Sequence, residues 1–309
     1  MSGLAVLCPG QGDQHSSMLD LALSSGPGAR TLEEVAPVLG EEPLSVARRG
    51  APGLYRNAVA QPLVCAAELA TWAALADTLP PALLFAGYSL GELAAHGCAG
   101  SLSATQTVAL AGVRARAMEA ASLSPGGLVA LRGLSVSRAE ALAAEVGATV
   151  AIVNGPDHCV LGGDEEALQA LERRAPGAGA AAVRRLPIGV PAHTPLLAGA
   201  VEPFAAALRS AGLADPRVPV LAGVSGQPVR RAEEAVAALS RQLAERIDWA
   251  RCLAAASEMG CSVYLELGPG NALSRMVRES LPAAAARSVE EFRSAEGVRR
   301  WVEASLARG

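Results

Sequence analysis

The sequence of 309 residues contains no lysine, so all 26 of its basic residues are arginine. The absence of lysine excludes Schiff-base enzymes such as those that use pyridoxal phosphate, and it excludes the lysine of a phosphate-binding loop. Any anionic ligand must therefore be held by arginine, by backbone N–H groups or by the N-terminus of a helix.

Aromatic residues are also scarce, at 3% of the chain, and no basic arm or long run of one charge accompanies the net charge of −4. With few aromatic side chains for base stacking and no basic arm, the sequence predicts no nucleic acid partner. Apolar residues make up 51% of the sequence, which is enough for a large core of Ala, Leu and Val.

The six cysteines form no CxxC pair, and most of them lie within apolar runs. They are Cys8, Cys65, Cys98, Cys159, Cys252 and Cys261. This pattern argues against a zinc site and a disulfide framework, and it is typical of buried thiols in a reducing cytoplasm. Signal-peptide features are missing, and no run of about 18 apolar residues is free of charges and breakers, so we expect a cytoplasmic protein with no membrane partner.

Short apolar runs that end at glycine or proline predict buried parallel strands. These runs cover residues 4–8, 82–86, 218–222 and 263–267. Ala/Leu-rich stretches at 63–79 and 104–121 predict helices, the second of which is capped by Ser103. Alternating strands and helices indicate an α/β fold with a mostly parallel sheet, like that of the α/β hydrolases.

The middle of the chain follows a different order. Strands are predicted at 128–131, 149–153, 158–161 and 181–186, and helices at 137–146 and 164–174. The order β-α-β-β-α-β is that of a ferredoxin-like fold. We therefore predict a small subdomain at 124–188, inserted into a large catalytic domain made of residues 1–123 and 189–309.

Residues 87–91 form a G-x-S-x-G pentapeptide between a predicted strand and a predicted helix. A serine on that sharp turn exposes its Oγ at the carboxyl edge of the sheet, where the helix N-terminus stabilises negative charge. In this context Ser89 is a candidate nucleophile, and the N–H of Leu90 is a candidate oxyanion donor.

A serine nucleophile needs a base, and the chain has four histidines. His15 follows the first loop and reads as solvated, His96 as a packing residue on the helix after Ser89, and His158 as part of a subdomain strand. His193 lies where the insert returns to the large domain, between prolines that stiffen the segment. His193 is therefore the candidate base.

A Pro-Gly-Gln-Gly segment at residues 9–12 directly follows the first strand. Its glycines allow the backbone to approach a ligand closely. If the strands are parallel, Gln11 projects an amide from the same sheet edge as Ser89, and together with a backbone N–H it can form an oxyanion hole.

Together these segments make the chain resemble the malonyl-CoA:acyl carrier protein transacylases and the acyltransferase domains of fatty acid and polyketide synthases. The matching segments are Pro9–Gly12, Gly87–Glu92 with Cys98–Gly100, Val190–His193 and the Glu-Leu-Gly-Pro-Gly of Glu266–Gly270. They occur in the same order and at similar spacing across nearly the whole chain.

The resemblance implies that Ser89 is the acylated nucleophile and His193 its base, with Gln11 and the Leu90 N–H as the oxyanion hole. It also implies that an arginine four positions before a methionine holds the free carboxylate of the acyl group, which selects Arg114. The donor would be malonyl-CoA and the acceptor the phosphopantetheine thiol of an acyl carrier protein. A coenzyme A thioester is then a substrate, with no permanently bound cofactor and no metal.

Three positions depart from the family's pattern or leave a role open. Tyr88 stands before the nucleophile, where histidine is usual, and Ala192 stands before the base, where serine or phenylalanine is common. The choice between malonyl and methylmalonyl therefore stays open. The family orients its histidine with a main-chain carbonyl near the position of Asp248, and the carboxylate of Asp248 is an alternative that would complete a triad.

Other functions compatible with parts of the sequence are a malonyl-transferring subunit of a malonate decarboxylase and a trans-acting transferase of a polyketide assembly line. A serine esterase or thioesterase is disfavoured, because the HGGG-type oxyanion loop is missing and a carboxylate clamp serves no purpose for a neutral ester. A non-catalytic scaffold would be expected to lack Ser89, Gln11 or His193, and all three are present.

Overall fold

The apolar runs of the large domain form a six-stranded sheet in the order β11-β10-β1-β2-β7-β8. The strands are β1 (Gly3–Cys8), β2 (Ala82–Gly87), β7 (Val220–Leu221), β8 (Pro228–Val229), β10 (Cys261–Glu266) and β11 (Ala285–Ser288). All neighbours pair in parallel except β7 and β8. This computed structural model describes residues 2–50 and 53–308. Because β1 and β2 are central and buried, their sequences are uninterrupted apolar runs.

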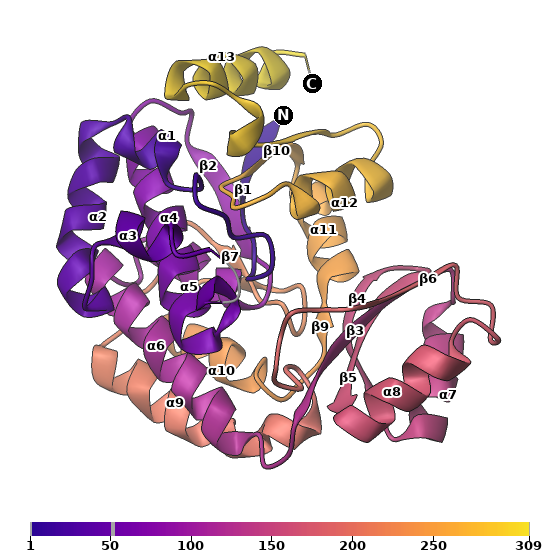
Figure 1. Cartoon of the computed structure of the whole chain (residues 1–309). Coiled ribbons are helices and arrows are strands. Elements are labelled where there is room, and N and C mark those ends of the chain that lie inside the picture. Colours follow the sequence, from indigo (N-terminus) through magenta and orange to yellow (C-terminus); the bar gives the residue numbers. More distant parts are fainter. Residues whose placement is uncertain (1, 51–52, 309) are drawn as a thin grey trace.

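Helices surround this sheet (Figure 1). Those before the insert are α1 (Asp20–Leu23), α2 (Gly26–Leu39), α3 (Pro43–Ala47), α4 (Asn57–Leu75), α5 (Leu90–Cys98) and α6 (Ala104–Ala121), with a 3-10 turn, η1 (Gly53–Tyr55). Those after it are α9 (Ala198–Ala211), α10 (Ala232–Arg241), α11 (Trp249–Glu258), α12 (Ala272–Ser280) and α13 (Ala295–Leu306), with the turns η2 (Pro195–Leu197) and η3 (Val289–Glu291).

Helix α4 is long and apolar enough to cross a membrane by length and composition, but 78% of that segment is buried inside the fold. It packs between α2 and α6 as a core helix. Four polar residues of α4 are also buried, namely Asn57, Gln61, Glu68 and Thr71. Asn57 and Gln61 contact residues of the predicted site.

The smaller lobe is a second sheet in the order β6-β3-β5-β4-β9 (Figure 1). Its elements are β3 (Gly126–Arg132), α7 (Val136–Val146), β4 (Thr149–Gly155), β5 (His158–Asp164), α8 (Glu165–Arg174) and β6 (Ala182–Arg185). These elements follow the ferredoxin-like order, and the four strands pair antiparallel. The sequence did not suggest the fifth strand, β9 (Ile247–Asp248), which comes from the large domain and pairs in parallel with β4.

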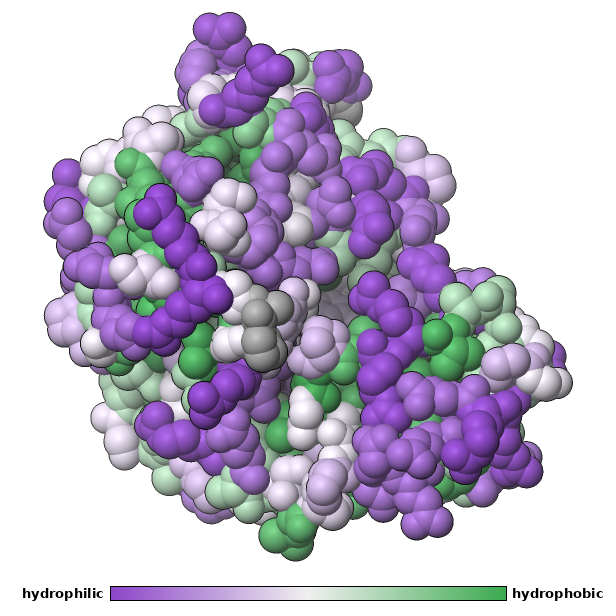
Figure 2. Space-filling model, in the orientation of Figure 1, coloured by the Kyte–Doolittle hydropathy of each residue, from purple (hydrophilic) through white to green (hydrophobic). Residues whose placement is uncertain are grey.

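The predicted fold class, an α/β protein with a parallel sheet, is confirmed. Helix α6 begins after Ser103, whose side chain accepts a hydrogen bond from Gln106 N in a capping box. The strand expected at 218–222 is shorter, because only Val220–Leu221 pairs with β2 and β8. The domain limits at 124 and 188 remain predictions. The surface is hollowed between the two lobes, with hydrophilic side chains at the edges of the hollow (Figure 2).

Candidate active site

Ser89 occupies the turn between β2 and α5 with a φ of 57°. This left-handed conformation is strained for serine and is typical of a nucleophile elbow. The two glycines of the pentapeptide are required by packing. A Cβ on Gly87 would lie 2.1 Å from Glu92 N, and a Cβ on Gly91 would lie 2.0 Å from the Cys8 carbonyl oxygen. The motif therefore lets α5 start directly against β1 and β2.

Ser89 and His193 form a hydrogen-bonded pair, with 2.7 Å between Ser89 Oγ and His193 Nε2. They are also the two non-glycine residues with positive φ in the described part of the chain, since His193 has a φ of 62°. Strained backbone at both members of a pair is a common property of functional sites. His193 N donates to the Leu243 carbonyl at 2.9 Å, which anchors the strained residue.

The imidazole of His193 is held in one tautomer. Its Nδ1 lies against the main-chain carbonyl of Gln242, so Nδ1 carries the proton and donates it to that oxygen. Nε2 is then free to accept the Ser89 hydroxyl proton. Burial and the nearby Arg114 lower the pKa of His193 to about 3, which keeps the ring neutral in the free protein.

Asp248 does not orient this histidine, so the alternative of a Ser-His-Asp triad is wrong. The Asp248 carboxylate caps α11 instead, where Oδ1 accepts a hydrogen bond from Arg251 N at 3.0 Å. The main-chain carbonyl of Gln242 orients His193 instead of the Asp248 carboxylate. Nothing in the sequence singles out Gln242 for this role, because a main-chain carbonyl is present in every residue type.

Arg114 reaches the pair from α6 and is only 2% exposed. Nη2 lies 3.4 Å from Ser89 Oγ and 3.1 Å from Gln242 Oε1, and Nη1 lies 2.9 Å from Gln61 Oε1 and 3.3 Å from Met118 Sδ. Burial lowers the pKa of Arg114 to about 10, so the guanidinium remains charged at neutral pH. A buried cation held mainly by neutral amides favours an anionic ligand.

The side-chain amide of Gln11, which we expected to donate to the oxyanion, already has a hydrogen-bond partner. Its side-chain Nε2 donates to Asn57 Oδ1 at 2.8 Å, so the amide is already engaged. The loop itself adjoins the elbow, because a Cβ on Gly10 would lie 3.8 Å from Ser89 Cβ. Within residues 2–50 and 53–308, the main-chain N–H groups of Gln11 and Leu90 donate to no other protein group. Both N–H groups are therefore available as donors.

The remaining histidines lie apart from this pair. His96 is buried, with Nδ1 3.3 Å from Ser101 Oγ, and burial lowers its pKa to about 4. His15 is part-exposed, and its Nε2 lies 2.6 Å from a carboxylate oxygen of Glu290. His158 begins strand β5 of the smaller lobe, as expected, and it also lines the cleft between the lobes.

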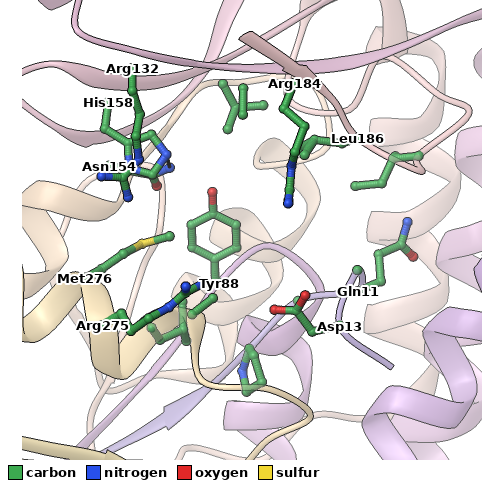
Figure 3. Close-up of a pocket in the computed structure, with 18 of the residues that line it drawn as sticks. Gln11, Asp13, Tyr88, Arg132, Asn154, His158, Arg184, Leu186, Arg275 and Met276 are labelled. Carbon is green, nitrogen blue, oxygen red and sulfur yellow. Dashed lines mark hydrogen bonds between the residues drawn. The ribbon is translucent and has the colours of Figure 1, made fainter. Parts of the chain in front are cut away.

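A cleft of about 520 Å³ separates the two lobes beside the elbow. Tyr88 lines it, and its hydroxyl points toward the side chains of the smaller lobe (Figure 3). Arg132 of β3 contacts Glu279 of α12 at 3.3 Å across the cleft. Arg184 and Arg275 point into the cavity from different walls and form no ion pair within the described residues (Figure 3). Such a cleft suits an elongated ligand that carries phosphate.

An elbow serine, a neutral histidine and the free N–H groups of Leu90 and Gln11 are the groups that acyl transfer through a serine ester requires. No cluster of three or more His, Cys, Asp or Glu side chains in the described residues could hold a metal ion. The family model described as "Acyl transferase domain" matches residues 6–302. The chain therefore belongs to the acyl transferase domain family, and it is an acyltransferase.

Individual relatives agree. A malonyl CoA-acyl carrier protein transacylase of Mycobacterium bovis is 32% identical over 295 residues, which is 93% of this chain and 96% of the relative. One from Escherichia coli K12 is 30% identical over 301 residues, which is 94% and 97% of the two chains.

Solved structures are similar over the whole chain. The malonyl CoA-acyl carrier protein transacylase of Coxiella burnetii has a TM-score of 0.92 at 26% identity, covering 99% of this chain and 98% of that one. A malonyl-transacylase in complex with a type II polyketide synthase acyl-carrier protein has a TM-score of 0.91 at 28% identity, covering 97% and 99%. The predicted family is confirmed.

Proposed function

We propose that this protein transfers a malonyl group from coenzyme A to the phosphopantetheine thiol of an acyl carrier protein, through an ester on Ser89. The observation that carries the proposal is the buried guanidinium of Arg114 beside the Ser89–His193 pair. The names of the relatives, malonyl CoA-acyl carrier protein transacylases, support the same substrates.

In the first half-reaction, Ser89 Oγ attacks the thioester carbonyl while His193 Nε2 takes the hydroxyl proton. The N–H groups of Gln11 and Leu90 stabilise the tetrahedral oxyanion by hydrogen bonds. The positive end of the α5 dipole stabilises the same negative charge. The carbon–sulfur bond then breaks, and the imidazolium returns its proton to the departing coenzyme A thiolate. Malonyl-Ser89 remains.

In the second half-reaction, the thiol of the carrier arm enters through the cleft and gives its proton to His193 Nε2. The sulfur attacks the acyl-serine carbonyl, and the bond between the acyl carbon and Ser89 Oγ breaks. His193 returns the proton to Oγ, which restores the free enzyme. Arg184 and Arg275 are positioned to attract the phosphate of either arm as it enters the cleft.

Arg114 selects the acyl group. A malonyl carboxylate can accept two parallel N–H bonds from the guanidinium, whereas an acetyl group leaves the buried cation without a counter-charge. The carboxylate also offsets the charge that lowers the pKa of His193. A charged acyl group therefore raises the basicity of the histidine that must deprotonate Ser89. This preference also argues against a serine esterase that acts on neutral esters.

We further propose that the reaction needs no permanently bound cofactor, because the thioester supplies the driving force and the residues above perform each proton transfer. A cytoplasmic location is supported by six cysteines that are all free thiols.

The test is intact mass spectrometry after mixing the protein with malonyl-CoA, methylmalonyl-CoA or acetyl-CoA. We expect a malonyl adduct that is lost on addition of a holo acyl carrier protein, with the malonyl group appearing on the carrier. Ser89→Ala should abolish the adduct. Absence of a malonyl adduct on the wild-type protein, or an equal adduct from acetyl-CoA, would overturn the proposal.

A further inference from the structure

Two buried polar groups next to the site have no part in the mechanism above: the carboxyl group of Glu92 and the side-chain amide of Gln242. Glu92 lies on α5, one turn after Ser89, and is fully buried. Its Oε2 accepts hydrogen bonds from Gly223 N at 3.0 Å and from Gln242 Nε2 at 2.8 Å. Its Oε1 has no partner among the described residues, so Oε1 is the atom that holds the proton when Glu92 is neutral.

The amide of Gln242 connects Glu92 to the site. Besides its bond to Glu92, Nε2 donates to the Ser89 carbonyl at 3.2 Å, and Oε1 accepts from Arg114 Nη2 at 3.1 Å. Gln242 itself is completely buried. One side chain thus links the carboxylate clamp, the nucleophile elbow and a buried acid, in a region where polar bonds reinforce one another.

This inference rests on the proposed function. We propose that Gln242 is a positioning residue that couples Glu92 to Arg114, so that neutral Glu92 favours binding of a negatively charged acyl group and ionised Glu92 opposes it. The reason is charge balance in a buried site. With neutral Glu92, a malonyl carboxylate neutralises Arg114, whereas with ionised Glu92 the same carboxylate leaves an excess negative charge.

The surroundings of Glu92 make its charge variable near neutral pH. Burial raises the pKa of Glu92 to about 7, opposed by its two N–H donors and by the charge of Arg114. The titratable side chains that interact with it are Arg114 of α6 and Cys252 of α11, and burial also raises the pKa of that thiol, which keeps it neutral. The Gly223 loop and the segment after α10 contribute N–H donors only.

The consequence is an acyl selectivity that depends on pH. Binding of malonyl takes up a proton above the pKa of Glu92, so its affinity falls by as much as tenfold for each unit of rising pH. Acetyl carries no carboxylate and shows no such dependence. We define the selectivity as the ratio of kcat/KM for malonyl-CoA to kcat/KM for acetyl-CoA. Both thioesters carry the same coenzyme A phosphates, so the effect of phosphate ionisation cancels in this ratio.

The experiment measures this ratio for Ser89 acylation from pH 5.5 to 8.5 in the wild type, Glu92→Gln and Gln242→Met. Gln242→Met retains the main-chain carbonyl that holds His193 and removes only the amide. Matched controls on the exposed surface of α8 are Glu166→Gln and Gln169→Met. Circular dichroism and urea unfolding report whether each variant is folded.

We expect the wild-type ratio to fall by up to about 25-fold between pH 6.5 and 8.5, since most of this range lies above the pKa of Glu92. In Glu92→Gln it should stay at its low-pH value, and in Gln242→Met it should be at least tenfold lower at low pH, through a higher KM for malonyl-CoA. A pH dependence that persists in Glu92→Gln would overturn the inference. A Gln242→Met variant that loses stability but keeps the wild-type ratio would overturn it too. Failure of the wild type to form a malonyl adduct would instead refute the proposed function.

Discussion

Replacing Arg114 with methionine removes the buried cation while keeping a side chain of similar length. In the free protein the guanidinium donates to amide oxygens of Gln61 and Gln242 at 2.9 Å and 3.1 Å, so it is already placed for a ligand oxygen. A malonyl carboxylate would gain two charge-assisted hydrogen bonds, each worth about 1.5–3 kcal/mol. Part of that gain is offset because the arginine gives up contacts to the two glutamines.

A net loss of about 3–4 kcal/mol corresponds to a decrease of roughly 10² to 10³-fold in kcat/KM for malonyl-CoA. Acetyl-CoA should respond differently. Since the charge of Arg114 lowers the pKa of His193, its removal makes His193 a stronger base. We therefore expect acylation by acetyl-CoA to change by less than about fivefold, on the scale of one ordinary hydrogen bond.

The assay is rapid-quench acylation of Ser89, read by intact mass with each thioester in turn. Arg116→Met is the matched control, because Arg116 lies on the same helix and is exposed. A malonyl rate that falls less than fivefold in Arg114→Met would refute this reasoning. An equal loss with both thioesters would also refute it, because it would mean that Arg114 supports the site without recognising the carboxylate.

Three further outcomes can be checked. Gly91→Ala places a Cβ 2.0 Å from the Cys8 carbonyl oxygen and should lower the free energy of unfolding in urea by about 3 kcal/mol or more. The control is Gly189→Ala, whose new Cβ would have no atom within 4 Å and should change that free energy by less than about 1 kcal/mol. Burial lowers the pKa of His96 to about 4, so the wild-type protein loses stability as pH falls from 6.5 toward 4. His96→Gln lacks this titration, and its free energy of unfolding in urea should rise relative to that of the wild type by about 1.4 kcal/mol for each unit of falling pH in that range. Gln11→Ala should slow single-turnover acylation less than about tenfold, because its main-chain N–H remains; a loss of 10² to 10³-fold would identify the side chain as an oxyanion donor.

The parts of the site that are encoded locally could be predicted from the sequence. The turn around Ser89 needs a strand, two glycines and a helix within a few residues, and all of these are visible in the local pattern. His193 could be selected because only four histidines exist and one lies in a rigid segment. The α/β class followed from apolar runs that alternate with helical stretches, for the same local reason.

The parts that depend on tertiary structure could not be predicted. The Gln242 carbonyl has no side-chain signature, so its position became known only from the packing of α10 against the elbow. The Gln11 side chain is engaged by Asn57, 46 residues away, and no local rule anticipates that contact. A partial signal was available in α4, where polar residues at 57 and 61 interrupt an apolar helix one turn apart.

Strand β9 ties the two lobes together in a way that limits how they can move. Ile247 and Asp248 pair with Ile152 and Val153 of the smaller sheet, and the segment just before β9 provides the carbonyls that bind His193. A wide hinge opening would therefore strip hydrogen bonds from a strand or drag the general base away from its serine. Strand β9 therefore disfavours a change in the relative arrangement of the two lobes while the Ser89–His193 pair is intact.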